Sequence, residues 1–205
     1  MERQEAIEKI NSILGVDLRK LAEKYEVTVF KDGKKNKGWA GHVIERHLGL
    51  HLNSAPTPNF GSWELKTISL KRLRNGELAI KETMAITMID AYDVERKSFE
   101  ESHLMSKLKK IVMVARIWEN QQETSSLCHA VKTFDLDNPA IYQQVKEDYD
   151  LVRRNIIERG FSSLTGKMGT YIQPRTKGPG HGSTSRAFYA RAPFLKTIFL
   201  ETQDY

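Results

Sequence analysis

Cysteine is almost absent from this sequence, since Cys128 is the only one among 205 residues. A single cysteine excludes a disulfide within the chain, and no cluster of Cys and His has the spacing of a zinc site. Proteins that work without disulfides are typical of reducing compartments. We therefore expect a cytoplasmic protein.

Long apolar runs are also missing. No segment approaches the roughly 20 apolar residues that a membrane helix needs. The first ten residues, MERQEAIEKI, are charged and lack the apolar run of a signal peptide. The sequence therefore predicts a protein with no membrane partner.

Acidic residues are in the minority. The chain has 26 Asp and Glu against 32 Lys and Arg, which gives a net charge of +6. A basic balance suits an anionic partner such as nucleic acid, although many ordinary proteins are equally basic. The 40% hydrophobic content is enough for a folded core, and the length predicts one domain.

Hydrophobic periodicity predicts an α/β or mixed α+β fold. Residues 31–37, KDGKKNK, are interpreted as a solvated basic loop. Expected helices span 2–14, 17–25, 38–49, 99–108 and 139–159. Expected strands span 63–70, 78–87, 111–118 and 127–135. The last fifty residues add GTYIQPR, a glycine-rich loop, RAFYARA and FLKTIFL.

The segment PNFGSWELK at 58–66 holds the clearest chemical pattern. Glu64 and Lys66 lie two apart on an expected strand, and period two places both side chains on one face. A carboxylate can hold a divalent cation such as Mg²⁺, and a neighbouring lysine can orient water or stabilise developing charge. Such a pair suits phosphodiester hydrolysis, although a surface salt bridge is the alternative. A second acidic residue is expected a few positions upstream, where this chain has Asn59.

Seven segments, taken in order along the chain, resemble segments of the MutH family, which belongs to the PD-(D/E)XK nucleases together with type II restriction endonucleases. They are NKGWAGHVIERHLG (36–49), PNFGSWELKTI (58–68), ETMAIT (82–87), ESHLMSKLKKIVMV (101–114), KEDYDLVRRNI (146–156), GTYIQPR (169–175) and FLKTIF (194–199). The resemblance implies a restriction-endonuclease-like fold, with a central mixed sheet flanked by helices. It implies one domain with a helical part at about 1–35, a catalytic core at about 36–135 and a DNA-reading part at about 136–205.

The same resemblance implies the roles of five residues. Glu45 matches a helix-borne glutamate that faces the metal, Asn59 takes the place of a metal-binding aspartate, and Glu64 and Lys66 match the E-x-K pair. Lys107 matches an additional active-site lysine. Mg²⁺ is thus expected on Glu45, Asn59 and Glu64. The alternative for Glu45 is a solvated helix residue, and neighbouring lysines leave the register at Lys107 open.

Asn59 is the main departure from the family pattern. An amide oxygen can bind a metal, but it carries no charge and holds a hard cation more weakly. The chain is either an engineered inactive variant or a natural member with weak or lost activity. The survival of Glu45, Glu64, Lys66 and Lys107 favours the engineered variant.

The stretch from Arg159 to Lys196 contains no Asp or Glu and many glycines. Basic side chains and accessible backbone amides suit phosphate binding, and a solvated loop is the alternative. The resemblance places Phe194 where the mismatch-repair enzyme of the MutH family has a tyrosine close to a DNA base. The DNA-binding candidates are Arg175, Lys177, Arg186, Arg191, Phe194 and Lys196.

These patterns favour Mg²⁺-dependent cleavage of double-stranded DNA at a short recognition sequence. A type II restriction enzyme is preferred over a repair enzyme for two reasons. The loop between Asn59 and Glu64 is shorter than in the mismatch-repair protein of the family, and Phe194 replaces its tyrosine. A mismatch-repair strand-nicking enzyme, partnered by a MutL-type ATPase, is the first alternative. A DNA-binding module without catalysis is the second, since Asn59 permits it.

Overall fold

A computed structural model describes residues 1–50, 61–178 and 184–199 of the chain. These residues divide into two compact units. The first unit comprises 1–50, 61–81 and 112–133, and the second comprises 82–111, 134–178 and 184–199. The prediction of a single endonuclease domain stays a prediction.

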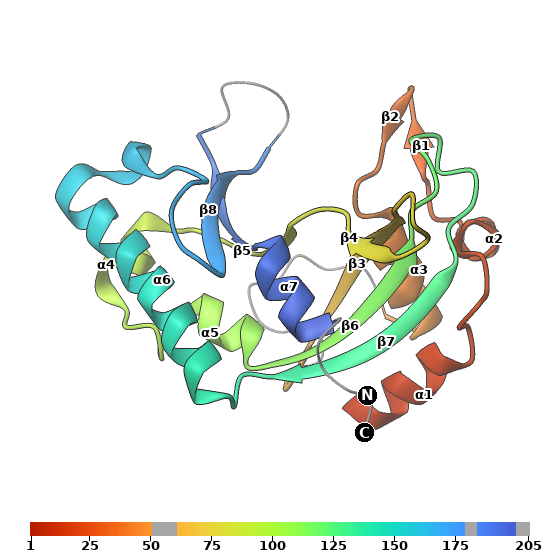
Figure 1. Cartoon of the computed structure of the whole chain (residues 1–205), viewed down its shortest axis with the longest axis horizontal. Coiled ribbons are helices and arrows are strands. Elements are labelled where there is room, and N and C mark those ends of the chain that lie inside the picture. The colour runs from red at the N-terminus through yellow and green to blue at the C-terminus, as the bar shows by residue number, and fades with distance from the viewer. Residues whose placement is uncertain (51–60, 179–183, 200–205) are drawn as a thin grey trace. The chain divides into compact units, whose positions relative to one another are not determined.

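Three helices belong to the first unit: α1 (Arg3–Asn11), α2 (Leu18–Lys24) and α3 (Trp39–His47). The sequence predicted all three, because apolar residues recur at helical spacing. Asp17 begins α2 by accepting a hydrogen bond from the Arg19 backbone at 2.9 Å. Helix α3 packs against α1, α2 and strand β3, so its apolar side is buried (Figure 1).

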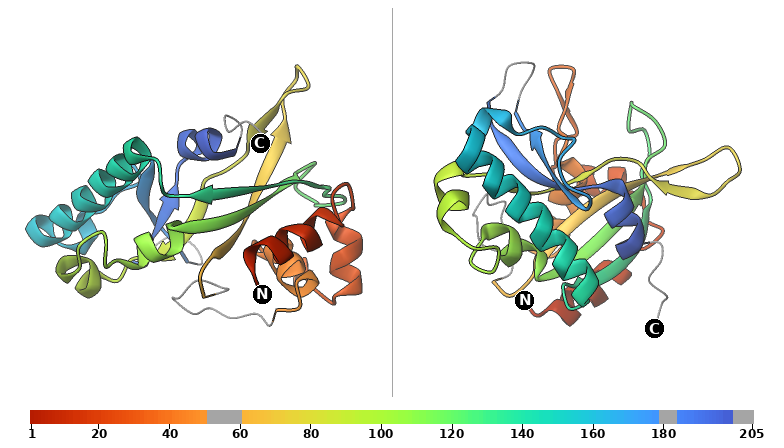
Figure 2. Two further views of the ribbon diagram at one scale, coloured as in Figure 1. Left: turned by 90° about the horizontal axis from the view of Figure 1, so that it is seen from below. Right: turned by 60° about the vertical axis from the view of Figure 1, so that its left-hand side comes forward.

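Four strands form the main sheet of the first unit, in the order β4-β3-β6-β7. They are β3 (Glu64–Arg72), β4 (Leu78–Ile80), β6 (Lys110–Ile117) and β7 (Cys128–Asp135). Strand β6 lies inside this order, and its residues from Ile111 to Ile117 are buried, as its apolar run predicted. The β3–β4 hairpin and the connection from β6 to β7 extend beyond the sheet (Figure 2).

The prediction of an irregular loop at 31–37 is wrong in one respect. Strands β1 (Phe30–Lys31) and β2 (Lys34–Lys35) pair there as an antiparallel hairpin. Asp32 and Gly33 form its turn with φ of 51° and 71°. Two positive φ values are the requirement of a type I′ turn, and Asp-Gly is a favoured sequence for it.

The second unit has a three-stranded sheet in the order β5-β9-β8. Its strands are β5 (Met84–Met88), β8 (Ile172–Thr176) and β9 (Arg186–Ala190), and both pairings are antiparallel. The single strand predicted at 78–87 is wrong, because its first part pairs with β3 and its second part pairs with β9. Alternation within one segment does not show that its two halves join different sheets.

Helices of the second unit are α4 (Ala91–Arg96), α5 (His103–Leu108), α6 (Pro139–Arg159) and α7 (Ala192–Phe199), with a short 3₁₀ turn at Phe161–Ser163. The α6 prediction is confirmed at both ends. The Asn138 side chain accepts hydrogen bonds from the backbone of Ala140 and Ile141 at 3.0 and 3.2 Å. Pro139 suits the first turn, because a proline has no N–H to leave unsatisfied there. Helix α4 was not predicted.

Runs of two or three strands are separated by helices along the chain, and the predicted α/β fold with a mixed sheet and flanking helices is confirmed. None of the helices in the described ranges has the length and apolar character to cross a bilayer.

Candidate active site

Strand β3 places the side chains of Glu64 and Lys66 together. The Lys66 ammonium lies 2.8 Å from the Glu64 carboxylate. Leu65, between them in the sequence, is buried, as expected where successive side chains alternate between faces. The Glu64 side chain is only 3% exposed, so the pair is not an ordinary surface salt bridge.

Helix α3 brings Glu45 to the same place. The helix lies directly over β3, because a Cβ added at Gly41 would come within 3.6 Å of the Thr67 hydroxyl. Burial raises the pKa of the half-buried Glu45 carboxyl. The charge of Glu64 raises this pKa further, and the Lys66 ammonium lowers it. The structure therefore brings Glu45, Glu64 and Lys66 together, as expected.

These residues fit a hard divalent cation. Two carboxylates held close to one another repel, and a bound cation with oxygen ligands would relieve that repulsion. Within the described ranges, no group of three or more His, Cys, Asp and Glu gathers as a metal site. Asn59, the third expected ligand, lies outside the described residues. Glu45 and Glu64 could supply two of the oxygen donors that such a cation needs, and their role as ligands stays a prediction.

Lys107 lies in the last turn of α5, in the second unit, and is 6% exposed. The Ser102 hydroxyl begins this helix by accepting a hydrogen bond from the Met105 backbone at 3.0 Å. Burying an ammonium is costly unless it is paired or hydrogen-bonded. Its function beside the carboxylates stays a prediction.

Arg175 is the exposed base-reading candidate on β8. Its guanidinium donates a hydrogen bond to the Thr83 hydroxyl at 2.7 Å and lies 5.5 Å from the centre of the Tyr189 ring. Both contacts orient the guanidinium while leaving other donors for a ligand. Lys177 and Lys196 are also exposed, whereas Arg186 is half-buried and donates to the Thr184 carbonyl at 3.1 Å.

Two other DNA-binding candidates have structural contacts. Arg191 donates to the carbonyls of Gly166 and Met168 and to the Gln173 side chain, at 3.1 to 3.3 Å. Phe194 has no exposed surface and stacks on Tyr171, with ring centres 4.9 Å apart. Arg191 therefore holds the loop before β8, and Phe194 packs in the core of its unit. Their predicted contacts with DNA stay untested.

Asp148 is a residue of this region that sequence reasoning missed. It is 3% exposed, and its carboxylate accepts hydrogen bonds from the backbone N–H groups of Thr170, Tyr171 and Ile172 at 2.7 to 2.8 Å. The chain is thereby fixed where it enters β8. The signal was present in α6, because Asp148 falls on the apolar stripe of Val145, Tyr149 and Val152. A carboxylate on such a stripe needs partners when buried.

The family model that describes the DNA mismatch repair enzyme MutH matches residues 48–154 of this chain. The match includes Asn59, Glu64, Lys66 and Lys107, and it begins just after Glu45. It spans more than half of the chain. The chain belongs to the MutH family, which is a family of nucleases.

Curated relatives extend the similarity over almost the full length. The DNA mismatch repair protein MutH of Vibrio cholerae serotype O1 is 25% identical over 205 residues, covering 98% of this chain and 92% of the relative. The protein of that name from Haemophilus ducreyi is 27% identical over 226 residues, with 98% and 95% covered. A solved structure of restriction endonuclease MvaI with its cognate DNA aligns with 88% of this chain and 95% of that one, at 14% identity and a TM-score of 0.38. A likeness this slight supports no conclusion.

Proposed function

We propose that this chain hydrolyses phosphodiester bonds of double-stranded DNA at a short recognition sequence and requires Mg²⁺. The observation that carries the proposal is the meeting of Glu45, Glu64 and Lys66 where α3 packs on β3. Placing two carboxylates and an ammonium in a largely buried site costs stability. The same groups are well suited to bind a hard cation and a charged substrate.

Each residue has a role in this proposal. Glu45 and Glu64 would hold the cation together with Asn59. A cation bound there polarises the scissile phosphate. Lys66 stabilises the negative charge that develops on the phosphate during attack, and it orients the attacking water. Lys107 adds a second positive charge in the transition state.

The exposed basic residues of the second unit would hold the duplex. Arg175, at the end of a strand, suits bidentate pairing with guanine in the major groove. Lys177 follows Arg175 closely and suits a phosphate. Asp148 and Arg191 hold β8, the strand that carries Arg175, through their hydrogen bonds to the segment that leads into it.

A type II restriction enzyme is the function we propose first, because the loop between positions 59 and 64 and the residue Phe194 differ from what the resemblance leads us to expect of a repair enzyme. The relatives named MutH favour the second candidate, a repair nickase that acts with a MutL-type ATPase. The two differ in product: linear plasmid indicates restriction, whereas nicked circles that depend on the ATPase indicate repair. A DNA-binding module without catalysis is the third candidate, and Asn59 favours it.

Two measurements test the proposal. Calorimetric titration with Mg²⁺ should show binding to the unmodified chain and none to Glu64→Gln. Supercoiled plasmid of diverse sequence should be cut by the Asn59→Asp protein at defined sites, and only with Mg²⁺. Plasmid left intact by Asn59→Asp, with duplex binding retained, would support the binding module and exclude the nuclease.

A further inference from the structure

The β1–β2 hairpin is a basic arm whose function is unassigned. Each of its strands has only two residues. An isolated two-stranded hairpin is at best marginally stable in water. Its position must therefore come from contacts with the rest of the first unit.

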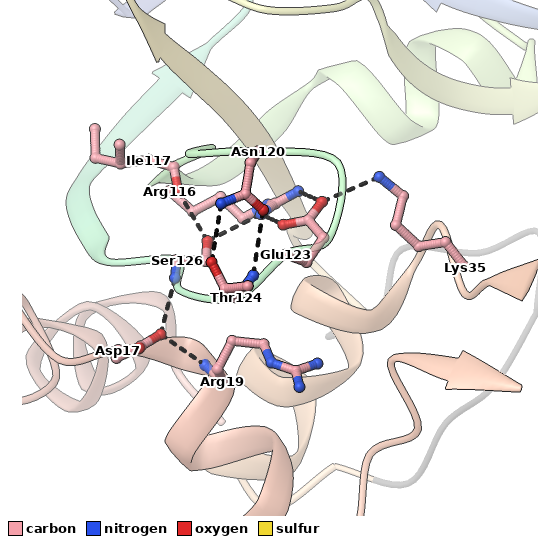
Figure 3. A network of polar contacts seen from close by, with 9 residues as sticks. All are labelled: Asp17, Arg19, Lys35, Arg116, Ile117, Asn120, Glu123, Thr124 and Ser126. Atoms are coloured by element: carbon pink, nitrogen blue, oxygen red, sulfur yellow. Dashed lines mark hydrogen bonds and ion pairs between the residues drawn. The ribbon is translucent and has the colours of Figure 1, made fainter. Parts of the chain in front are cut away.

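A buried carboxylate supplies the main contact. The Lys35 ammonium lies 3.0 Å from Glu123, whose side chain is completely buried (Figure 3). Arg116 on β6 donates to the two Glu123 oxygens at 2.6 and 3.0 Å. Glu123 therefore links the hairpin to the main sheet, and because it is shielded from solvent, salt screens this link little.

The loop that carries Glu123 is itself held. Arg116 and Ser126 share a hydrogen bond of 2.9 Å, and Asp17 accepts one from the Ser126 backbone at 2.8 Å (Figure 3). Glu123 has a φ of 50°, which an L-residue rarely adopts. Such a conformation persists only where its surroundings enforce it. The network thus fixes the loop, and the loop fixes the hairpin.

The hairpin tip carries charge without an internal partner. Lys31 and Lys34 are exposed, and neither forms an ion pair with any residue that the structure describes. The two lysines also face one another directly across the hairpin. Like charges directly opposite one another are destabilising. An anion bound between them would remove this repulsion.

The hairpin is coupled to the helix that carries Glu45. The Asn36 side chain donates to the Thr28 carbonyl at 3.0 Å and accepts from the Gly38 backbone at 3.1 Å. The Arg116 guanidinium lies 5.2 Å from the centre of the Trp39 ring. Trp39 begins α3, and six residues of helix carry the chain about 9 Å to Glu45.

We propose that Lys31 and Lys34 bind backbone phosphates of the duplex, and that the Lys35–Glu123–Arg116 network holds the hairpin that carries them in place. The inference rests on the proposed function. The contact is with phosphate and carries no sequence information. It would add a phosphate contact on the first unit to the basic residues that we propose for DNA binding in the second unit.

The first test compares two double variants by fluorescence anisotropy on a labelled 30-base-pair duplex, without Mg²⁺, over a series of salt concentrations. Lys31→Ala with Lys34→Ala should lower the slope of log affinity against log salt by about 2 and weaken binding about tenfold or more at 0.1 M salt. Lys20→Ala with Lys24→Ala removes the same charge from exposed positions on α2 and should change the slope little. Equal slopes for the two double variants would overturn the proposal.

The second test addresses the anchor. Glu123→Gln makes the protein more positive, so charge alone should tighten DNA binding. A loosened hairpin should instead weaken DNA binding several-fold, and tighter or unchanged binding by a folded Glu123→Gln protein would overturn the anchoring role.

Lys35→Met keeps the Arg116–Glu123 pair, so it decides the question if Glu123→Gln does not fold. Lys35→Met should weaken binding, Lys35→Arg should restore it, and unchanged binding by Lys35→Met would contradict the anchor.

Failure of this inference is distinct from failure of the proposed function. If the unmodified chain binds no duplex at any salt concentration, the nuclease and the binding module both fail. If the unmodified chain binds duplex and the hairpin variants behave as their controls, only the hairpin inference fails.

Discussion

The Lys66 ammonium lies 2.8 Å from the Glu64 carboxylate, and the two side chains are 17% and 3% exposed. A divalent cation held by Glu64 must share this carboxylate with the lysine. Two positive charges near one carboxylate weaken each other's binding. In the proposed function, Lys66 would therefore lower the affinity for the cation while stabilising negative charge on the phosphate.

Removal of Lys66 should separate these two effects. We expect Lys66→Ala to bind Mg²⁺ several-fold more tightly than the unmodified chain, because the competing ammonium is gone. In the Asn59→Asp background the same change should abolish cleavage, because the transition state loses its cation. Calorimetry gives the first result and plasmid cleavage the second. Weaker Mg²⁺ binding by Lys66→Ala would show that the lysine does not compete.

Restoring a carboxylate at position 59 should raise catalysis. Asn59→Asp adds a charged oxygen ligand, and we expect the rate of Mg²⁺-dependent cleavage to increase about tenfold or more, which corresponds to an activation barrier lower by about 1.4 kcal/mol or more. Adding Glu64→Ala should remove that activity. Sequencing of the product ends with and without Mg²⁺ also gives the recognition site. Full activity of the Asn59→Asp, Glu64→Ala protein would contradict the metal assignment.

The pKa of Glu45 should make stability depend on pH. Burial and the charge of Glu64 raise this pKa in the folded state. The folded state therefore holds a proton on Glu45 that the unfolded chain has already released, so stability falls as pH rises through the interval between the two pKa values. Glu45→Gln should consequently have a higher Tm than the unmodified chain at pH 8, and this advantage should vanish near pH 4.

Glu5, a glutamate whose pKa is shifted in the opposite direction, is the control for this measurement. A hydrogen bond from Lys9 lowers the pKa of the exposed Glu5 carboxyl. Its charged form therefore favours the folded state above the unfolded pKa, so Glu5→Gln should lower the Tm at pH 8 or leave it unchanged. If Glu45→Gln and Glu5→Gln shift the Tm in the same direction, the environment assigned to Glu45 is wrong.

In the second unit, we expect Arg175 to recognise bases and Lys177 to bind phosphate, and mutation should distinguish the two roles. Arg175→Ala should lower affinity for the cognate duplex more than for scrambled DNA, with a loss of discrimination of about 1–3 kcal/mol. Lys177→Ala should weaken binding to both duplexes equally. It should also reduce the slope of log affinity against log salt concentration by about one. Binding to both duplexes at two salt concentrations distinguishes the roles. Equal losses on both duplexes for Arg175→Ala would make it a phosphate contact.

Asp148 should be among the most sensitive positions for stability. Asp148→Ala leaves three backbone N–H groups, one of them fully buried, without this acceptor, and we expect a loss of about 2–3 kcal/mol in the free energy of unfolding. The neighbouring Glu147 is exposed, so Glu147→Ala should change this free energy by about 0.5 kcal/mol or less. Urea unfolding of both variants gives the comparison. Similar values for the two would mean that the N–H groups find other partners.

Gly169 offers a second test of the same contact. It has a φ of 75°, and a Cβ there would overlap the Ile172 carbonyl and lie 3.1 Å from the Asp148 carboxylate carbon. Gly160 has a similar φ of 78° but open space around it. Gly169→Ala should therefore cost clearly more stability than Gly160→Ala, for which about 1 kcal/mol is expected. Equal costs would show that the loop before β8 moves aside.

Local chemistry determined much of this protein from sequence alone. The limits of α6 follow from Asn138, Pro139 and Gly160, because a cap, a proline and a glycine act within one turn of the helix. The pairing of Glu64 with Lys66 follows from the period of a strand. The buried run of β6 follows from its continuous apolar residues. The first two depend on interactions between residues close together in the chain, and the third was indicated by the composition of the segment itself.

Tertiary structure decided what depends on contacts between distant residues. It divided the expected strand at 78–87 between two sheets, and it turned the basic loop at 31–37 into a hairpin anchored on Glu123. It buried Asp148 against a backbone segment more than twenty residues away and buried Phe194 against Tyr171. Propensity and periodicity describe a residue's own segment, whereas burial and hydrogen-bond partners depend on which other segment packs against it.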